Sequence, residues 1–139
     1  MTDMLYASIA GLDNFAIYFA ISIVLLFVFK FAYTLVTPQD EWKLVKDDKN
    51  TAAAIGFGGA MIGFGIALAG AVANSQNLVD FVVWGVIAIV AQCGAFALLR
   101  FTFMPKIVER IANQEISAGI MLAAMSIAVG MLNSASMTY

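Results

Sequence analysis

The chain has 139 residues, of which 63% are hydrophobic and 12% charged, with a formal net charge of −2. A water-soluble domain is nearer half apolar and a quarter charged, and one core of this size could not bury so much apolar surface. Composition therefore predicts a membrane protein. Seven Lys and Arg against nine Asp and Glu exclude the dense basic face of a nucleic-acid-binding protein, and the absence of His excludes His metal sites and His general bases.

Four apolar segments follow in chain order, each near the ~20 residues that a helix needs to cross a bilayer. They cover about residues 14–36, 51–73, 79–99 and 116–137. Lipid cannot satisfy exposed backbone groups, and the segments lack the alternation of barrel strands, so helices are predicted. We expect an all-α membrane protein with four transmembrane helices in one membrane domain, residues 1–139.

Every basic residue lies in the last part of the first apolar segment or after the end of the first or third segment, before the next one begins. They are Lys30, Lys43, Lys46, Lys49, Arg100, Lys106 and Arg110. The positive-inside rule therefore places both connecting loops in the cytoplasm, and both termini and the turn at residues 74–78 on the outer side. Lys30 lies inside the apolar segment, from which its long stem can carry the ammonium to the interface.

The chain also has the pattern of a duplicated helical hairpin, with one repeat at about residues 14–74 and the second at about 79–137. Matching positions include Phe15 with Phe81, Ala53 with Ala118, Ile55 with Ile120, and Gly65 with Gly130. An even number of helices in each repeat makes the repeats parallel, related by an axis along the membrane normal. A tandem duplication is the simplest account of this pattern.

Small residues form a ridge at four-residue spacing on the second and fourth helices. The ridges comprise Gly59, Gly63, Ala67 and Ala71, and Ser126, Gly130 and Ser134. Such ridges let helix backbones approach closely within lipid. We expect the second and fourth helices to form an inner seam, and the bulkier first and third helices to face lipid or an outer layer. Use of the ridge in a homo-oligomer is the alternative.

Polar residues gather at the predicted outer ends of the helices: Asp13, Asn14, Asn74, Asp80 and Asn133. Capping explains the two Asp, because helix N-termini favour negative charge. The alternative is a shared outer vestibule for cations. Gln92, deep in the third helix, either forms a hydrogen bond with a neighbouring helix or lines a pore.

The predicted cytoplasmic loops carry candidate docking residues for a soluble partner: Trp42, Lys43, Lys46, Lys106 and Arg110. In the second loop Ile107, Val108 and Ile111 share one helical face, which is typical of a short amphipathic helix at the membrane surface. A plain membrane-surface anchor is the alternative for both loops.

The sequence contains no phosphate loop, no zinc-ligand spacing and no nucleophile beside a base. No helix carries a carboxylate near its centre, where a proton-coupled transporter would need one. The single Cys93 lies within an apolar segment, where a thiol packs as a small hydrophobic group. We therefore expect no enzyme activity, no metal and no cofactor.

Residues 37–42 (Thr-Pro-Gln-Asp-Glu-Trp), residues 50–53 and the tail at residues 133–139 resemble the YjfL-like small inner-membrane proteins, a bacterial family of unknown function. The resemblance covers nearly the whole chain. In the tail, Ser136 and Tyr139 stand where the family pattern has a Cys and a terminal Trp. The resemblance implies a bacterial plasma-membrane location and, more loosely, an association with cytoplasmic membrane-stress proteins. It brings no catalytic residues.

Two functions from different classes therefore remain. The first is a non-catalytic membrane subunit of an envelope-stress or membrane-maintenance system, which docks a soluble partner on its cytoplasmic loops. The second is a small oligomeric ion channel or exporter, in which the glycine-rich second helix lines or gates a pore.

Overall fold

The computed structural model describes residues 2–37 and 41–137, and this part of the chain is helical without strands. Its helices are α1 (Thr2–Ile9), α2 (Leu12–Val36), α3 (Glu41–Lys46), α4 (Thr51–Asn74), α5 (Leu78–Phe101), α6 (Ile107–Ala112) and α7 (Ile116–Ser136). Four helical segments are long and apolar enough to cross a membrane: α1 with α2, α4, α5 and α7. The predicted fold class is confirmed, and each predicted segment end lies within two residues of an observed helix end.

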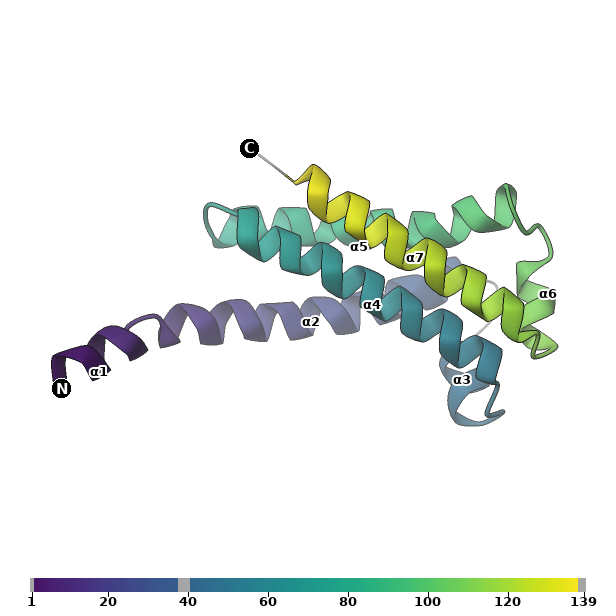
Figure 1. The fold of residues 1–139 in the computed structure, drawn as a ribbon, viewed down its shortest axis with the longest axis horizontal. Helices are drawn as coiled ribbons and strands as arrows, with labels where there is room; N and C mark the ends of the chain where they lie inside the picture. The colour runs from purple at the N-terminus through teal and green to yellow at the C-terminus, as the bar shows by residue number, and fades with distance from the viewer. Residues whose placement is uncertain (1, 38–40, 138–139) are drawn as a thin grey trace.

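The helices α4, α5 and α7 pack together, with the short helices α3 and α6 at one end of the molecule (Figure 1). The α4–α5 turn, the start of α1 and the end of α7 lie toward the opposite end (Figure 1). The loop segment at residues 38–40, which carries part of the family motif, and the last two residues lie outside the described part. The short helix predicted in the second loop is present as α6, and its position at the membrane surface stays a prediction.

Helices α4 and α7 form the closest contact between helices, at positions that leave no room for a side chain. Gly59 lies directly against the backbone of Ala123. A methyl group at Gly63 would collide with the carbonyl oxygen of Ser126, and one at Gly130 would collide with the carbonyl oxygen of Gly63. Glycine is required here because it lets the two backbones touch, as in small-residue helix contacts within lipid.

Helix α5 covers the side of this seam that the small residues leave open. Its side chains Phe81, Phe96 and Leu99 are buried, and its glycine Gly85 makes room for Leu25 of α2. The expectation that the third helix faces lipid or an outer layer fits one side of α5, where Val79 and Val90 are 74% and 67% exposed, while Phe81 and Phe96 on its other side pack into the bundle. The first helix faces outward as expected, because only 11% of its most apolar 18-residue stretch is buried.

Helix α2 joins the bundle through its second half. Phe29 stacks on Phe64 of α4 with ring centres 4.6 Å apart, and Tyr33 meets the edges of Phe57 and Phe96 at 6.0 Å. These rings bury large apolar areas between α2 and the bundle. In the first half of α2, Tyr18 also meets Phe81 of α5, whereas the helix α1, which the sequence did not predict, extends away from the other helices (Figure 1).

The two connecting loops end in the same backbone conformation. Lys49 and Gln114 have φ angles of 52° and 61°, in the left-handed region that residues other than glycine rarely adopt. Each stands one residue before the N-cap of the following helix, which is Asn50 for α4 and Glu115 for α7. The tandem duplication stays a prediction, and this shared turn supports it.

Candidate functional site

Helix α6 is held against the start of α4 by one buried side chain that serves both helices. Asn50 is 2% exposed, and its Oδ1 accepts a hydrogen bond of 3.0 Å from the backbone N–H of Ala53, which caps α4. Its Nδ2 donates to the carbonyl oxygen of Ile111 at 2.7 Å. Ile107 and Ile111 bury the apolar face of α6. The second loop is therefore built onto the bundle and does not merely connect two helices.

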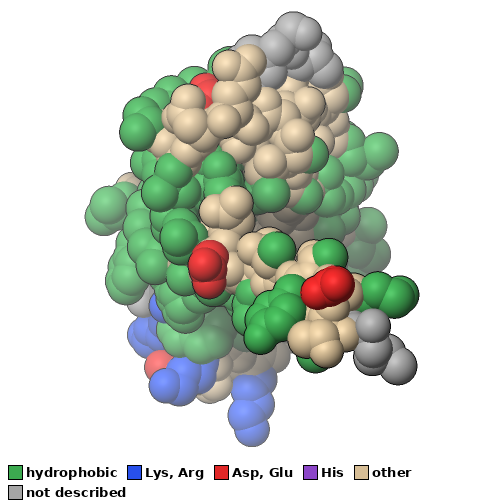
Figure 2. All heavy atoms as spheres, turned by 90° about the vertical axis from the view of Figure 1, so that its left-hand side faces the viewer, with side chains coloured by type: hydrophobic (Ala, Val, Ile, Leu, Met, Phe, Trp, Pro, Cys, Tyr) green, Lys and Arg blue, Asp and Glu red, His purple; other side chains and the backbone are tan. Residues whose placement is uncertain are grey.

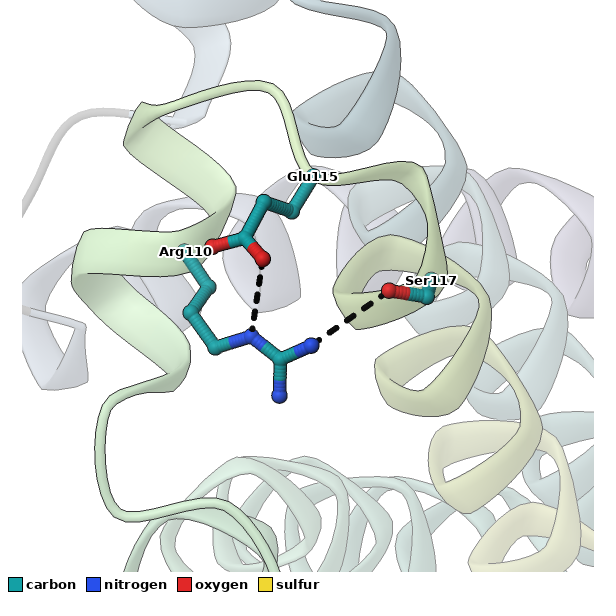
Figure 3. Close-up of polar contacts among 3 residues, drawn as sticks. All are labelled: Arg110, Glu115 and Ser117. Carbon is teal, nitrogen blue, oxygen red and sulfur yellow. Dashed lines mark hydrogen bonds and ion pairs between the residues drawn. The ribbon is translucent and has the colours of Figure 1, made fainter.

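Arg110 links α6 to the beginning of α7 (Figure 3). Its Nε lies 3.3 Å from Oε1 of Glu115, and its Nη2 donates to Oγ of Ser117 at 3.4 Å. The side chains of Arg110 and Glu115 are 37% and 45% exposed, so the pair contributes at most about 1 kcal/mol. Of the predicted docking residues, Arg110 is thus engaged within the chain.

The remaining predicted docking residues lie on the outside of the same end of the molecule. Trp42 is 44% exposed, and its ring centre lies 6.5 Å from that of Phe57 in α4. Lys43 and Lys46 on α3 are exposed, as is Lys106 at the start of α6. The structure therefore brings the basic residues of both loops to one end, on two short helices (Figure 1).

A polar contact crosses the centre of the bundle where α4, α5 and α7 meet. Gln92 of α5 is 1% exposed, and its Nε2 donates to the carbonyl oxygen of Ser126 at 3.0 Å. The backbone of Gly63 passes so close that a methyl group there would lie 2.6 Å from the same Nε2. The hydrogen bond from Gln92 to a neighbouring helix is confirmed. Among the described residues, Oε1 of Gln92 and Oγ of Ser126 have no hydrogen-bond partner.

At the opposite end, the predicted polar residues on α4 and α5 form local hydrogen bonds. Asn77, which sequence reasoning missed, caps α5 by accepting from the backbone N–H of Asp80 at 2.9 Å. Asp80 in turn accepts from the backbone N–H of Gln76 at 3.0 Å. Asn74 donates to the carbonyl oxygen of Gly70 at 2.8 Å. An Asn directly before an apolar segment was the sequence signal for the cap.

The start of α2 lies further out than the start of α5. Tyr18 meets Phe81 with ring centres 5.1 Å apart, and Asp13 is about 7 Å beyond Tyr18 along the helix. Viewed from this end, the acidic side chains stand apart, with hydrophobic and uncharged atoms between them (Figure 2). Among the described residues, no group of three His, Cys, Asp or Glu could hold a metal ion. The geometry gives no common acidic cluster.

Asn14 and Asn133 lie in different surroundings at this end. Asn14 is exposed and borders a largely apolar groove of about 310 Å³ on the first half of α2. The groove is lined by Asn14, Phe15, Tyr18, Phe19, Ser22 and Val72. Asn133 lies on α7, and its Nδ2 is buried without a hydrogen-bond partner among the described residues.

The four apolar spans and the loop helices at one end define a multi-pass helical membrane protein. Residues 5–137 match the family model described as "Domain of Unknown Function (DUF350)", and the chain belongs to this family. It is 38% identical over 125 residues to the "UPF0719 inner membrane protein YjfL" of Escherichia coli strain K12, covering 90% of this chain and 93% of the relative. The protein of that name from Escherichia coli O157:H7 matches equally.

No solved structure matches the chain. The family resemblance inferred from the loops and the tail is confirmed, and the chain is a multi-pass inner-membrane protein of a family without an assigned function.

Proposed function

We propose that this protein is a non-catalytic membrane subunit of an envelope-stress or membrane-maintenance system, which docks a soluble partner on its cytoplasmic end. The observation that carries the proposal is the construction of that end. Asn50, Ile107 and Ile111 fix α6 on the bundle, while the side chains of Trp42 and Lys106 remain exposed. A loop whose position is fixed presents its charged side chains in a constant arrangement, as specific recognition requires.

The orientation that this proposal needs has both termini outside the cytoplasm. The end that carries α3 and α6 holds the basic residues of both loops, and cytoplasmic loops of membrane proteins carry an excess of Lys and Arg. Single cysteines at Ser75 and Lys46 test it in whole cells with a membrane-impermeant maleimide. Ser75→Cys should be labelled in intact cells and Lys46→Cys only after lysis, and the reverse pattern would exclude the proposed orientation. Native Cys93 is buried in α5 and provides the unlabelled background.

Docking is tested by cross-linking in native membranes, followed by purification of the tagged full-length protein. The variant Lys46→Glu/Lys106→Glu reverses two exposed charges on α3 and at the start of α6. The matched control, Asp3→Lys/Asp13→Lys, reverses two exposed charges at the opposite end. We expect the first variant to lose partners that the wild type and the control retain. An unchanged set of partners would refute the docking surface.

The second candidate function is a small oligomeric channel or exporter. It is favoured by the unpaired polar atoms of Gln92 and Ser126, because buried polar groups without partners are costly and water in an opened pathway would satisfy them. Monovalent-cation flux into vesicles that contain the purified protein tests this function. Flux that disappears in Gln92→Leu would favour the channel, and a signal equal to that of protein-free vesicles would favour the docking subunit.

A further inference from the structure

One lysine on α2 is held between aromatic rings at the end of the bundle that carries the loop helices. Nζ of Lys30 lies 4.9 Å from the ring centre of Trp42 and 5.4 Å from that of Phe31. Among the residues that the structure describes, Lys30 has no ion-pair partner. A lysine ammonium has three N–H groups that can donate hydrogen bonds. An aromatic face attracts the positive charge but does not take up these donors as an oxygen acceptor would. The group is therefore held in place with its hydrogen-bonding capacity largely unused.

The position of this ammonium is fixed by the bundle. Trp42 belongs to α3, and its ring also contacts that of Phe57, which is buried in α4. Lys30 stands six residues before α2 ends at Val36, about 9 Å along the helix axis. Trp and Lys at such a depth are typical of the boundary between hydrocarbon and headgroups. The contact thus turns the lysine toward the membrane surface on the side of α3.

The surface beside Lys30 suits a lipid chain. Phe27, Phe31 and Leu35 follow one ridge of α2 and are 60%, 64% and 87% exposed. An acyl chain can lie along this ridge while its headgroup reaches the ammonium. A phosphate oxygen is the anionic acceptor that this depth of the membrane supplies, and charge complementarity selects a headgroup with net negative charge over a zwitterionic one.

We propose that Lys30 and Trp42 form a binding site for the phosphate of an anionic phospholipid in the leaflet that faces α3. The ammonium of Lys30 donates to the phosphate, and the Trp42 ring keeps the ammonium in position. Lys46 lies on the same short helix as Trp42 and adds to the positive potential there. It is not part of the proposed site. The proposal does not rest on the soluble partner proposed above, although Trp42 belongs to both surfaces.

The two tryptophans of the chain make the site measurable. The variant Trp84→Phe retains Trp42 as its only tryptophan. The variant Trp42→Phe retains Trp84, which lies in the first half of α5, away from α3. Each full-length protein is reconstituted in phosphatidylcholine vesicles with equal fractions of dibrominated phosphatidylglycerol or dibrominated phosphatidylcholine. Bromine quenches tryptophan on contact, so the ratio of the two quenching curves gives the preference of each tryptophan's surroundings for the anionic lipid.

We expect Trp42 to prefer the anionic lipid about fivefold, the equivalent of about 1 kcal/mol for one basic group near the surface. Trp84 should show no preference. In the Trp84→Phe protein, Lys30→Gln should abolish the preference, Lys30→Arg should retain it, and the matched change Lys46→Gln should leave most of it. A preference that survives Lys30→Gln, or that Lys46→Gln removes equally, would overturn the proposal. If Lys30→Gln does not fold, the Trp84→Phe protein with its native Lys30 still tests the proposal. A Trp42 that shows no preference for the anionic lipid in that protein would overturn the proposal.

Discussion

The sharpest test of the fold is a single added methyl group at the centre of the α4–α7 seam. In Gly63→Ala the new Cβ would overlap the carbonyl oxygen of Ser126 and lie 2.6 Å from Nε2 of Gln92. The first of these atoms is backbone, and the second is buried and hydrogen-bonded to that same carbonyl. Neither can move aside at little cost, so α4 and α7 must separate locally.

The expected loss of stability follows from three terms. Inserting a methyl group into a tightly packed contact costs about 1–3 kcal/mol, and an interhelical hydrogen bond in a membrane protein averages about 0.6 kcal/mol. The higher helix propensity of Ala offsets up to about 1 kcal/mol. Gly63→Ala should therefore lower the free energy of unfolding by roughly 0.5–3.5 kcal/mol.

The same helix provides the control. No atom of the described residues, apart from its own helix and chain neighbours, lies within 4 Å of a methyl group placed on Gly65. Gly65→Ala should leave stability unchanged or raise it by up to about 1 kcal/mol. Unfolding of both variants is followed by far-ultraviolet circular dichroism while sodium dodecyl sulfate is titrated into detergent micelles. If Gly63→Ala unfolds at the same point as the wild type and Gly65→Ala, the close contact at the seam is refuted.

Three further predictions concern other contacts and use the same titration. Asn50→Ala should lose about 2–3 kcal/mol, because it removes the cap and leaves the Ile111 carbonyl without its partner. Asn50→Ser should lose less because its hydroxyl can keep the cap, and equal losses would contradict this assignment. Arg110→Gln should lower stability by less than about 1 kcal/mol at low salt, and this loss should shrink further at high salt. A large loss that does not depend on salt would contradict an exposed Arg110–Glu115 pair. Gln92→Leu should change stability by less than about 1 kcal/mol, because it keeps a side chain of similar volume and removes an unpaired acceptor. Gln92→Ala should lose about 2–4 kcal/mol, because it leaves a cavity where the side chain was; similar losses in the two variants would contradict this account.

The membrane spans could be predicted from the sequence because lipid imposes one length and one backbone structure on any apolar segment that crosses it. The α4–α7 seam could be anticipated for a similar reason, since small residues four positions apart on a helix lie on one face. Helix α1 was missed because its eight residues are too few for a span and carry no strong helical signal of their own. Its boundary is local, at the Gly11 that precedes α2.

The packing of α5 and the construction of the end that carries α3 and α6 could not be predicted in the same way. Residue size suggested that the third helix faces lipid or an outer layer, but not that Phe81 and Phe96 on one of its sides would be buried. This burial depends on the packing of α5 against α2, α4 and α7 at once. Asn50 binds a carbonyl 61 residues later in the chain, at Ile111, and no spacing rule relates two such positions. The partner of Lys30 is likewise on another helix, at Trp42.

We predict that these long-range contacts couple the seam to the proposed docking surface. At the loop end of the seam, a methyl group on Gly119 would collide with the carbonyl oxygen of Ala52, two residues after Asn50. At the other end, one on Gly70 would collide with Ser134. Both changes strain the seam, but only Gly119→Ala acts on the turn that positions α6. In the cross-linking experiment, Gly119→Ala should therefore lose partners that Gly70→Ala retains, although neither residue belongs to the docking surface. Equal retention by the two variants would show that the loops keep their arrangement without the seam.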